Sequence, residues 1–279
     1  MTERLTSFSR DGLTLDVRDT GPRDGPVVAL LHGFPQKSSS WSRVAALLNE
    51  QGLRTIAPDQ RGYSPGARPK GRWAYRGSEL IADTEALVRA VGGPVHLVGH
   101  DWGAAIAWGV AALRPELVRS LVAVSVPHPA AFLGSMLRSD QARRSWYFAF
   151  FQLPLVPEML AARDRMFPSF MTNVGMTAEM VDRFRVEFVR DDVLTGPLNW
   201  YRALPFASPT DIRRRVTVPT TMVWSDGDKA LGRTGAEMAE AWVDAPYELR
   251  VLEGVSHWIP DEAPDALADA VLDRIATVA

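Results

Sequence analysis

The stretch VHLVGHDWG, residues 95–103, is followed by the apolar run AAIAWGVAAL, residues 104–113. Its first four residues are typical of a buried strand, and the apolar run is typical of a helix that ends near Pro115. Glycines stand two positions before and two positions after Asp101, so a strand and a helix can approach each other closely there. The stretch therefore predicts a tight strand-turn-helix junction that exposes the Asp101 side chain at the carboxyl end of a strand.

Apolar runs similar to residues 95–98 recur along the chain and predict further strands that are buried on both faces. They span residues 27–31, 121–126, 220–224 and 249–252. Helical periodicity separates them: Leu80 and Leu87 fall on one helical face, and Leu267 and Val271 fall on another. This alternation predicts an α/β fold, with a mostly parallel sheet and helices on both of its faces.

The chain begins with a different pattern. Asp11-Gly12 is a tight-turn dipeptide, and Leu13, Leu15 and Val17 alternate with polar residues after it. We therefore expect an antiparallel hairpin before the parallel strands begin.

Residues 128–209 interrupt the alternation of strands and helices. This part of the sequence has no clear buried strand, and it contains several prolines and many aromatic residues, among them Trp146, Phe151 and Trp200. We expect a mainly helical insertion that forms a lid over an apolar pocket. The α/β core is then expected to consist of residues 1–127 and 210–279.

The composition narrows the class of protein. The chain has 279 residues, of which 46% are hydrophobic and 23% are charged, and its formal net charge is −2. Nothing in this balance favours nucleic acid or an anionic membrane as a partner, and the basic runs at residues 143–144 and 213–215 are interpreted as solvated surface. The absence of cysteine excludes disulfide bonds, thiolate catalysis and cysteine-bound zinc.

The sequence has no targeting or membrane-spanning pattern. The charged residues Glu3 and Arg4 stand near the beginning of the sequence, and no apolar segment follows them. The longest nearly unbroken apolar run is residues 104–113. That run is too short to cross a bilayer, and the first residues do not resemble a signal peptide. We therefore expect a soluble cytoplasmic protein, whose oligomeric state the sequence leaves open.

Asp101 occupies the position at which a junction of this type presents a nucleophile. Attack of a carboxylate on an acyl group would give an anhydride, whereas attack on an sp³ carbon gives an alkyl ester. A strained epoxide and a carbon–halogen bond are the natural targets. Asp101 needs no base to activate it, because a carboxylate is ionised at neutral pH. The alternative interpretation is a strand-end aspartate that caps the following helix.

A base and an acid are expected later in the chain, each just past a strand, where the ligand sites of open α/β sheets gather. His257 follows the strand expected at residues 249–252 and is the candidate base for a water molecule. Asp226 and Asp228 follow the strand expected at residues 220–224, and both are candidates for the carboxylate that orients His257. A metal site at these two aspartates is a further alternative, which nothing else in the sequence supports.

Nearly the whole chain resembles the epoxide hydrolases of the α/β-hydrolase family. The shared motifs are HGFP at residues 32–35, GHDWG at residues 99–103 and the histidine motif at residues 257–258. The resemblance implies Asp101 as the nucleophile and His257 as the base, and it implies that the backbone N–H groups of Phe34 and Trp102 form the oxyanion hole. It implies neither a cofactor nor a metal ion.

The resemblance favours Asp228 as the acid, because the family has its acid four residues after the position of Trp224. Ser225 stands where the family usually has glycine, and this departure keeps Asp226 open as a substitute. Some relatives carry the acid after the strand expected at residues 121–126, where this chain has SVPH and no carboxylate.

Two tyrosines distinguish the epoxide hydrolases, which use them to hydrogen-bond the epoxide oxygen and protonate the alkoxide. The segment GPLNWYR, residues 196–202, resembles the motif that carries one of them, which implies Tyr201. The segment YFAFFQLP, residues 147–154, resembles the segment that carries the other, which implies Tyr147. The expected substrate is a small apolar epoxide.

Two other functions remain open. A haloalkane dehalogenase would share Asp101 and Trp102, but it needs halide donors that the loop at Phe34-Pro35 lacks, and it has no use for the tyrosine pair. A fluoroacetate-type dehalogenase would need an arginine at position 102. A non-catalytic binding protein on this fold would have lost a catalytic group, and all the expected groups are present.

Overall fold

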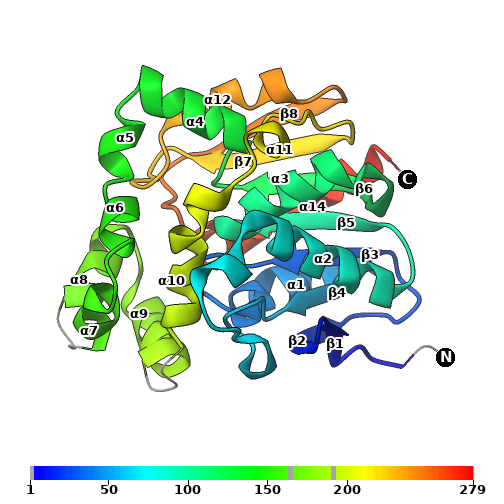
Figure 1. Cartoon of the computed structure of the whole chain (residues 1–279). Coiled ribbons are helices and arrows are strands. Elements are labelled where there is room, and N and C mark those ends of the chain that lie inside the picture. The colour runs from blue at the N-terminus through cyan, green and yellow to red at the C-terminus, as the bar shows by residue number, and fades with distance from the viewer. Residues whose placement is uncertain (1–2, 163–165, 190–192, 279) are drawn as a thin grey trace.

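The computed structural model describes residues 3–162, 166–189 and 193–278, and in these residues one eight-stranded sheet forms the centre of the molecule (Figure 1). The strands are β1 Ser7–Arg10, β2 Leu13–Thr20, β3 Val27–Leu31, β4 Arg54–Pro58, β5 Val95–His100, β6 Val118–Val124, β7 Thr220–Ser225 and β8 Tyr247–Leu252. Their order is β1-β2-β4-β3-β5-β6-β7-β8. Strand β2 pairs antiparallel with both β1 and β4, and all the other neighbouring strands pair parallel. The expected mostly parallel sheet and the expected N-terminal hairpin are confirmed.

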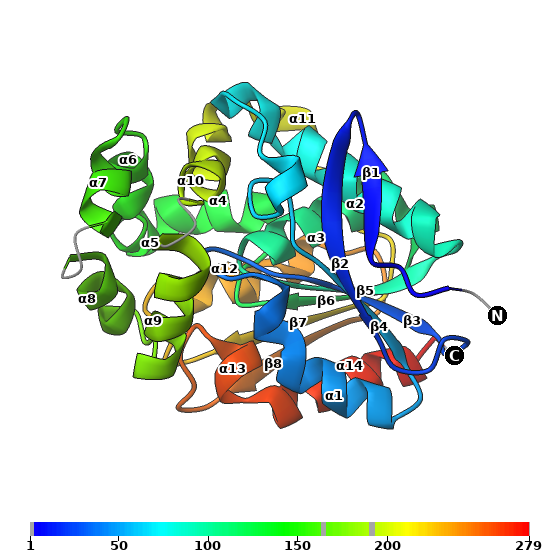
Figure 2. The ribbon, with the colours of Figure 1, turned by 90° about the horizontal axis from the view of Figure 1, so that it is seen from below.

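Helices cover both faces of the sheet. Those associated with the core are α1 Ser42–Glu50, α2 Gly77–Val91, α3 Trp102–Leu113, α12 Arg233–Met238, α13 Ile259–Glu262 and α14 Pro264–Ala276, with short turns η1 Ser38–Trp41, η2 Pro65–Ala67, η3 Arg72–Tyr75, η4 Pro115–Leu117 and η7 Glu240–Trp242. The sheet lies between α1 and α14 on one side and α2, α3 and α12 on the other (Figure 2). The central strands are therefore shielded from water on both faces. This explains why the sequences of β3 and β5 contain continuous apolar runs.

Two strands differ from the sequence expectation. The strand expected at residues 121–126 begins earlier and ends at Val124, because Ser125 has a backbone φ of 67°, outside the strand region. The strand expected at residues 249–252 is not buried on both faces: β8 is the edge strand, and Val251 remains 36% exposed. Glu248 and Arg250 fit this exposed position, since charged side chains protect a sheet edge from pairing with another chain.

Between β6 and β7 the described residues form helices and no strand. These helices are α4 Pro129–Arg138, α5 Gln141–Arg144, α6 Tyr147–Phe151, α7 Val156–Ala162, α8 Met166–Asn173, α9 Ala178–Phe184, α10 Thr195–Arg202 and α11 Pro209–Ile212, with a π-helical turn η5 Arg185–Val189 and a short turn η6 Leu204–Phe206. Helices α5 to α9 lie at the left of Figure 1, on the side of the sheet opposite to the two chain termini. The lid assignment of residues 128–209 remains a prediction, and residues 163–165 and 190–192 within it lie outside the described residues.

Ion pairs and hydrogen bonds tie this insertion to the core. Arg183 of α9 donates to both carboxylate oxygens of Asp261, at 2.8 and 2.9 Å. The Ser39 hydroxyl donates to Glu187 of η5 at 2.6 Å. Charge-assisted and partly buried bonds of this kind are stronger than neutral hydrogen bonds, so they fix the position of α9 and η5 relative to η1 and α13.

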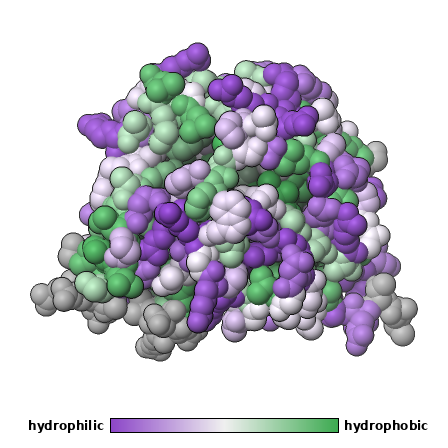
Figure 3. Space-filling model, viewed as in Figure 1, coloured by the Kyte–Doolittle hydropathy of each residue, from purple (hydrophilic) through white to green (hydrophobic). Residues whose placement is uncertain are grey.

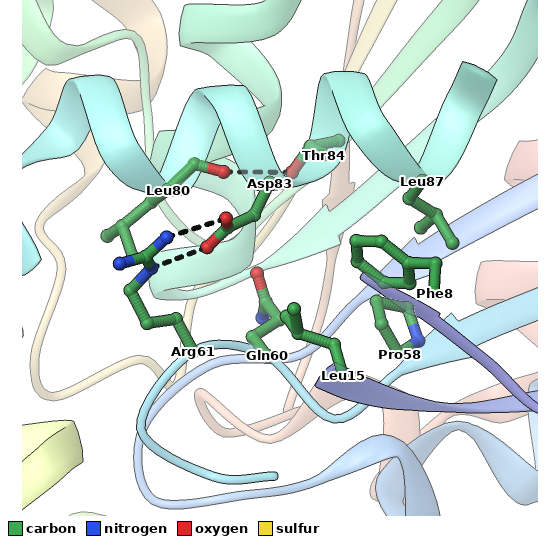
Figure 4. Close-up of a pocket in the computed structure, with 9 residues that line it drawn as sticks. All are labelled: Phe8, Leu15, Pro58, Gln60, Arg61, Leu80, Asp83, Thr84 and Leu87. Carbon is green, nitrogen blue, oxygen red and sulfur yellow. Dashed lines mark hydrogen bonds and ion pairs between the residues drawn. The ribbon is translucent and has the colours of Figure 1, made fainter. Parts of the chain in front are cut away.

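A buried ion pair holds the loop after β4 against α2. Arg61 donates to both carboxylate oxygens of Asp83, at 2.6 and 2.8 Å (Figure 4). Arg10 donates to the same carboxylate at 2.7 Å. The cavity beside this pair, which Phe8 and Leu15 also line, measures only about 10 Å³. That is room for about one water molecule, so the pair stabilises the loop and does not form a ligand site.

Within the described ranges, no helix is long and apolar enough to cross a membrane. Over the same residues, no group of three or more His, Cys, Asp or Glu side chains is arranged to hold a metal ion.

Candidate active site

Asp101 lies at a strained turn between β5 and α3. Its backbone has φ 54° and ψ −121°, a conformation that non-glycine residues rarely adopt. The turn is possible because Gly99 and Gly33 have no Cβ. A Cβ at Gly99 would collide with the backbone of Gly103, and a Cβ at Gly33 would collide with the Asp101 side chain. The predicted junction is therefore observed, and it holds the carboxylate at the N-terminus of α3, where the helix dipole favours negative charge.

The Asp101 carboxylate receives donors from two sides. Phe34 N–H donates to Oδ1 at 2.7 Å, and Nε2 of His257 lies 3.5 Å from Oδ2. Burial raises the pKa of Asp101, but the hydrogen bond and charge of His257, with the backbone N–H of Trp102, outweigh burial and lower the pKa below its ordinary value. The side chain is therefore ionised, and the two backbone donors expected for an oxyanion hole both face it.

The structure brings His257 together with Asp228 and not with Asp226. Nδ1 of His257 lies 2.7 Å from Oδ2 of Asp228, whereas the Asp226 carboxylate accepts the backbone N–H of Gly254, also at 2.7 Å. Burial lowers the pKa of His257, but the two carboxylates on either side of its ring outweigh this effect and raise the pKa to about 10. With Asp101 ionised, the imidazole is therefore held as an imidazolium.

Asp228 itself is fixed by the loop that follows it. Its Oδ1 accepts the backbone N–H groups of Ala230 and Leu231 at 2.7 and 2.8 Å, and the residue is 3% exposed. Oδ2 is thereby aimed at His257. The close Asp–x–Asp spacing does not form a metal pair, because Asp226 and Asp228 accept hydrogen bonds from different loops.

Two further side chains, His100 and Ser125, donate hydrogen bonds to the backbone of His257. Of the two, His100 belongs to the GHDWG motif and Ser125 belongs to no motif identified in the sequence. The His257 carbonyl accepts from Nε2 of His100 at 2.9 Å and from the Ser125 hydroxyl at 3.0 Å. Burial and the neighbouring His257 lower the pKa of His100 to about 4, so it remains neutral. Ser125 is a residue that the sequence did not single out; its position directly after β6 was the available signal.

The loop that carries Phe34 is also positioned by hydrogen bonds. Gln60 donates its backbone N–H to Nε2 of His32 at 3.1 Å and its side-chain amide to the His32 carbonyl at 2.6 Å. His32 is fully buried, and burial lowers its pKa to about 4. The neutral ring therefore serves as an acceptor that fixes the loop beside Asp101.

Tyr147 and Tyr201, expected from two separate segments, lie together near Asp101. Their ring centroids are 6.0 Å apart, and Tyr201 is also 5.0 Å from the Trp102 ring centroid. Burial, followed by the charge of Asp101, raises the pKa of each phenol well above its ordinary value. Both hydroxyls therefore stay protonated and can act as donors.

Two neighbours fix the Tyr201 side of this pair. The Gln152 amide donates to the Tyr201 carbonyl at 2.8 Å, which links α6 to α10. The Phe34 ring packs edge-on against Tyr201, with centroids 5.3 Å apart. The Phe34 loop, the turn at Asp101 and helices α6 and α10 of the insertion thus meet at one site. This site combines an ionised carboxylate, two phenols, two backbone N–H donors and the His257–Asp228 pair.

The chain is similar to known proteins over nearly all of its length. The model of the alpha/beta hydrolase family matches residues 28–270. The AB hydrolase superfamily protein YfhM of Bacillus subtilis is 35% identical, and the match covers 95% of each chain. Epoxide hydrolase 4 of Mus musculus is 32% identical over 91% of this chain and 74% of its own length.

A solved structure gives the same result. The crystal structure of Epoxide Hydrolase A from Mycobacterium thermoresistibile matches with a TM-score of 0.84 and 26% identity, and the match covers 98% of each chain. Sequence and fold therefore agree: this chain belongs to the alpha/beta hydrolase family, and within that family it is one of the epoxide hydrolases.

Proposed function

We propose that this enzyme hydrolyses a small apolar epoxide to a vicinal diol through an ester formed on Asp101. One observation carries the proposal: two protonated phenols, Tyr147 and Tyr201, lie beside an ionised carboxylate. An ester-forming nucleophile needs only the carboxylate, but opening an epoxide also leaves an alkoxide that must be stabilised and protonated. Two phenols supply that function without a metal or a cofactor.

In the first step an Asp101 oxygen attacks a ring carbon, and the bond from that carbon to the epoxide oxygen breaks. Oδ1 accepts a short hydrogen bond from Phe34 N–H at 2.7 Å, whereas His257 Nε2 lies 3.5 Å from Oδ2, so Oδ2 is the less tightly held oxygen and the one that attacks. The ring oxygen takes a proton from Tyr147 or Tyr201 as its negative charge develops. These hydrogen bonds strengthen in the transition state, which is where they lower the barrier.

In the second step water attacks the carboxyl carbon of the ester. An ester carries no charge, so alkylation of Asp101 removes one of the two carboxylates that raise the pKa of His257. The imidazolium then gives its proton to the phenolate, which restores the phenol, and the neutral ring accepts a proton from the attacking water. The tetrahedral oxyanion is stabilised by Phe34 and Trp102 N–H groups. Its collapse breaks the bond between the carboxyl carbon and the alkoxide oxygen, which takes the proton from His257 and leaves as the diol. The Asp101 carboxylic acid then ionises, and its proton returns His257 to the imidazolium.

The haloalkane dehalogenase alternative has less support. Halide release needs free N–H donors near the nucleophile, but the Trp200 indole N–H donates to the Arg61 carbonyl at 2.9 Å. The Trp102 ring packs edge-on against Tyr201, a phenol without a role in halide release, with ring centroids 5.0 Å apart. Phe34 and Pro35 have no side-chain donor.

A panel of apolar epoxides and haloalkanes, given to protein treated with EDTA, tests the proposal. We expect diol from epoxides and no halide. Halide release without diol from any epoxide would replace the proposal with dehalogenase chemistry.

Two further parts belong to the proposal. Residues 128–209 act as the lid, because Tyr147 and Tyr201 both come from this insertion and complete the site only when it is docked on the core. The enzyme acts in the cytoplasm, since a chain without cysteines has no need of an oxidising compartment. Fractionation of cells that produce the protein tests the second statement, and recovery outside the cytoplasm would contradict it.

A further inference from the structure

One carboxylate, that of Asp261, joins three segments that surround the candidate active site. Asp261 lies on α13, four residues after His257, and its side chain is only 10% exposed. Arg183 of α9 donates to its two oxygens at 2.8 and 2.9 Å, and the side-chain amide of Gln36 donates to Oδ2 at 2.6 Å. Figure 2 shows α9 beside α13. The histidine segment, the insertion and the oxyanion loop (residues 32–37) are thus tied together at Asp261.

Gln36 belongs to the turn that carries Phe34. Its backbone N–H donates to the Gly33 carbonyl at 2.9 Å and closes a four-residue turn that has Phe34 at its second position. The Gln60 amide holds the other end of the loop with a hydrogen bond of 2.6 Å. The Phe34 N–H, which donates to Asp101 at 2.7 Å, therefore lies between two side-chain amides that fix the loop. A shift of Gln36 moves this donor, because only one residue separates the two in the chain.

Arg183 fixes the orientation of the Asp261 carboxylate. A guanidinium that bonds both oxygens restricts rotation of the carboxylate and keeps Oδ2 turned toward Gln36. The outer surface of the insertion shows hydrophobic and hydrophilic side chains interspersed (Figure 3), whereas Arg183 is directed inward, with its side chain only 25% exposed. Without Arg183 the Asp261 carboxylate would lose this charged partner and turn toward water, because a partly buried charge without a partner is unfavourable.

We infer that Asp261 is a positioning residue: it fixes Gln36, and thereby the Phe34 N–H of the oxyanion hole. Arg183 makes this effect depend on the insertion, because it holds the carboxylate only when α9 is docked on the core. The inference rests on the proposed ester mechanism and gives the insertion a second part in it, besides that of the tyrosines. The Phe34 N–H stabilises an oxyanion that forms only in the second step, so a displaced loop slows ester hydrolysis more than it weakens substrate binding.

The test measures ester hydrolysis in single turnovers, the Kd of the epoxide from the burst of ester formation, and Tm. Asp261→Asn should slow hydrolysis roughly tenfold, because its NH₂ group would face a donor; loss of a whole oxyanion-hole donor typically costs about 10²–10³. Arg183→Gln should cause a similar loss, and the double variant should be no slower than Asp261→Asn, since both act through one contact. Gln36→Met leaves the ion pair intact and should cause the same loss with little change in Kd, so it decides alone if Asp261→Asn does not fold.

Glu179→Gln is the matched control, since Glu179 of α9 faces Arg43 of α1 at 3.9 Å across the same interface and its side chain is 79% exposed. It should hydrolyse the ester at the wild-type rate, and a loss equal to that of Asp261→Asn would overturn the inference. A lower Tm of Asp261→Asn without slower hydrolysis, wild-type hydrolysis by Gln36→Met, or losses that add in the double variant would each overturn it as well. Failure of the proposed function differs from these results, because the wild-type protein itself would then form neither ester nor diol from any epoxide.

Discussion

Oδ2 of Asp228 lies 2.7 Å from Nδ1 of His257, while Nε2 of the same ring faces Asp101 at 3.5 Å. One carboxylate therefore orients the ring and the other lies where the ester forms. Asp226, two residues away, forms no hydrogen bond or ion pair with His257 in the described part of the chain and instead accepts the Gly254 N–H. The same aspartate-to-asparagine substitution can therefore be compared at the two positions. At Asp228 it changes the carboxylate that contacts His257, and at Asp226 it changes a hydrogen bond to the Gly254 loop.

Asp228→Asn is expected to slow ester hydrolysis strongly, because an amide can neither stabilise the imidazolium nor hold the reactive tautomer of His257. The expected loss is roughly 10²–10⁴ in the rate of the second step, the range typical of general-base catalysis. Single-turnover kinetics with separate detection of ester and diol measures it. Asp226→Asn serves as the control and should hydrolyse the ester at close to the wild-type rate. Equal effects of the two substitutions would mean that the second step does not depend on the Asp228–His257 pair.

Tyr147→Phe and Tyr201→Phe are each expected to slow alkylation by roughly 10² or less, because the remaining phenol still donates to the ring oxygen. The double variant should lose nearly all alkylation. Pre-steady-state formation of the ester is the measurement, since steady-state turnover would mix the two steps. Alkylation by the double variant at the wild-type rate would contradict the assignment of both residues.

The raised pKa of His257 predicts a pH dependence of stability. The folded protein binds the His257 proton more tightly than the unfolded chain, whose histidine has the ordinary pKa of 6.5. The resulting stabilisation is fully present below pH 6.5 and is lost as the pH rises through about 10. The difference in Tm between wild type and His257→Gln should therefore shrink between these two pH values. A difference that stays constant over this range would exclude a raised pKa.

Gly33→Ala tests the close approach of the oxyanion loop to the nucleophile. The new Cβ would lie 2.7 Å from Cγ of Asp101 and closer still to Cβ and Oδ1, so loop or carboxylate must move. Displacement of a reacting group by about 1 Å can cost roughly 10² in rate, and we expect a loss of that size. Gly77→Ala, where a Cβ meets nothing within 4 Å, is the control and should leave the rate unchanged. An active Gly33→Ala enzyme with wild-type alkylation would show that the carboxylate does not depend on this contact.

The central strands and the nucleophile turn could be predicted from sequence because their physical signals are local. Burial on both faces requires continuous apolar residues in β3 and β5, and the sharp turn at Asp101 requires Gly99 and Gly103. The exposed edge position of β8 could not be predicted, because strand order is a property of the whole sheet.

The choice between the two aspartates depends on contacts that are distant in the chain. The turn at residues 225–228 directs Asp226 toward Gly254 and Asp228 toward His257, and Ala230 and Leu231 fix the latter by their N–H groups. The role of Ser125 depends in the same way on the return of His257 to the end of β6. Spacing alone does not determine these long-range pairings.

Intact-protein mass spectrometry of the His257→Gln variant, quenched soon after mixing with an epoxide, tests the covalent mechanism most directly. Attack by Asp101 needs no base, and the Phe34 N–H still donates to its carboxylate in the variant, whereas hydrolysis of the ester needs His257 as the base, so the variant should accumulate one epoxide mass per chain. Proteolysis should locate that mass on the peptide containing Asp101, and Asp101→Ala should acquire none. Normal turnover by the His257→Gln variant, or label on any other residue, would contradict the mechanism.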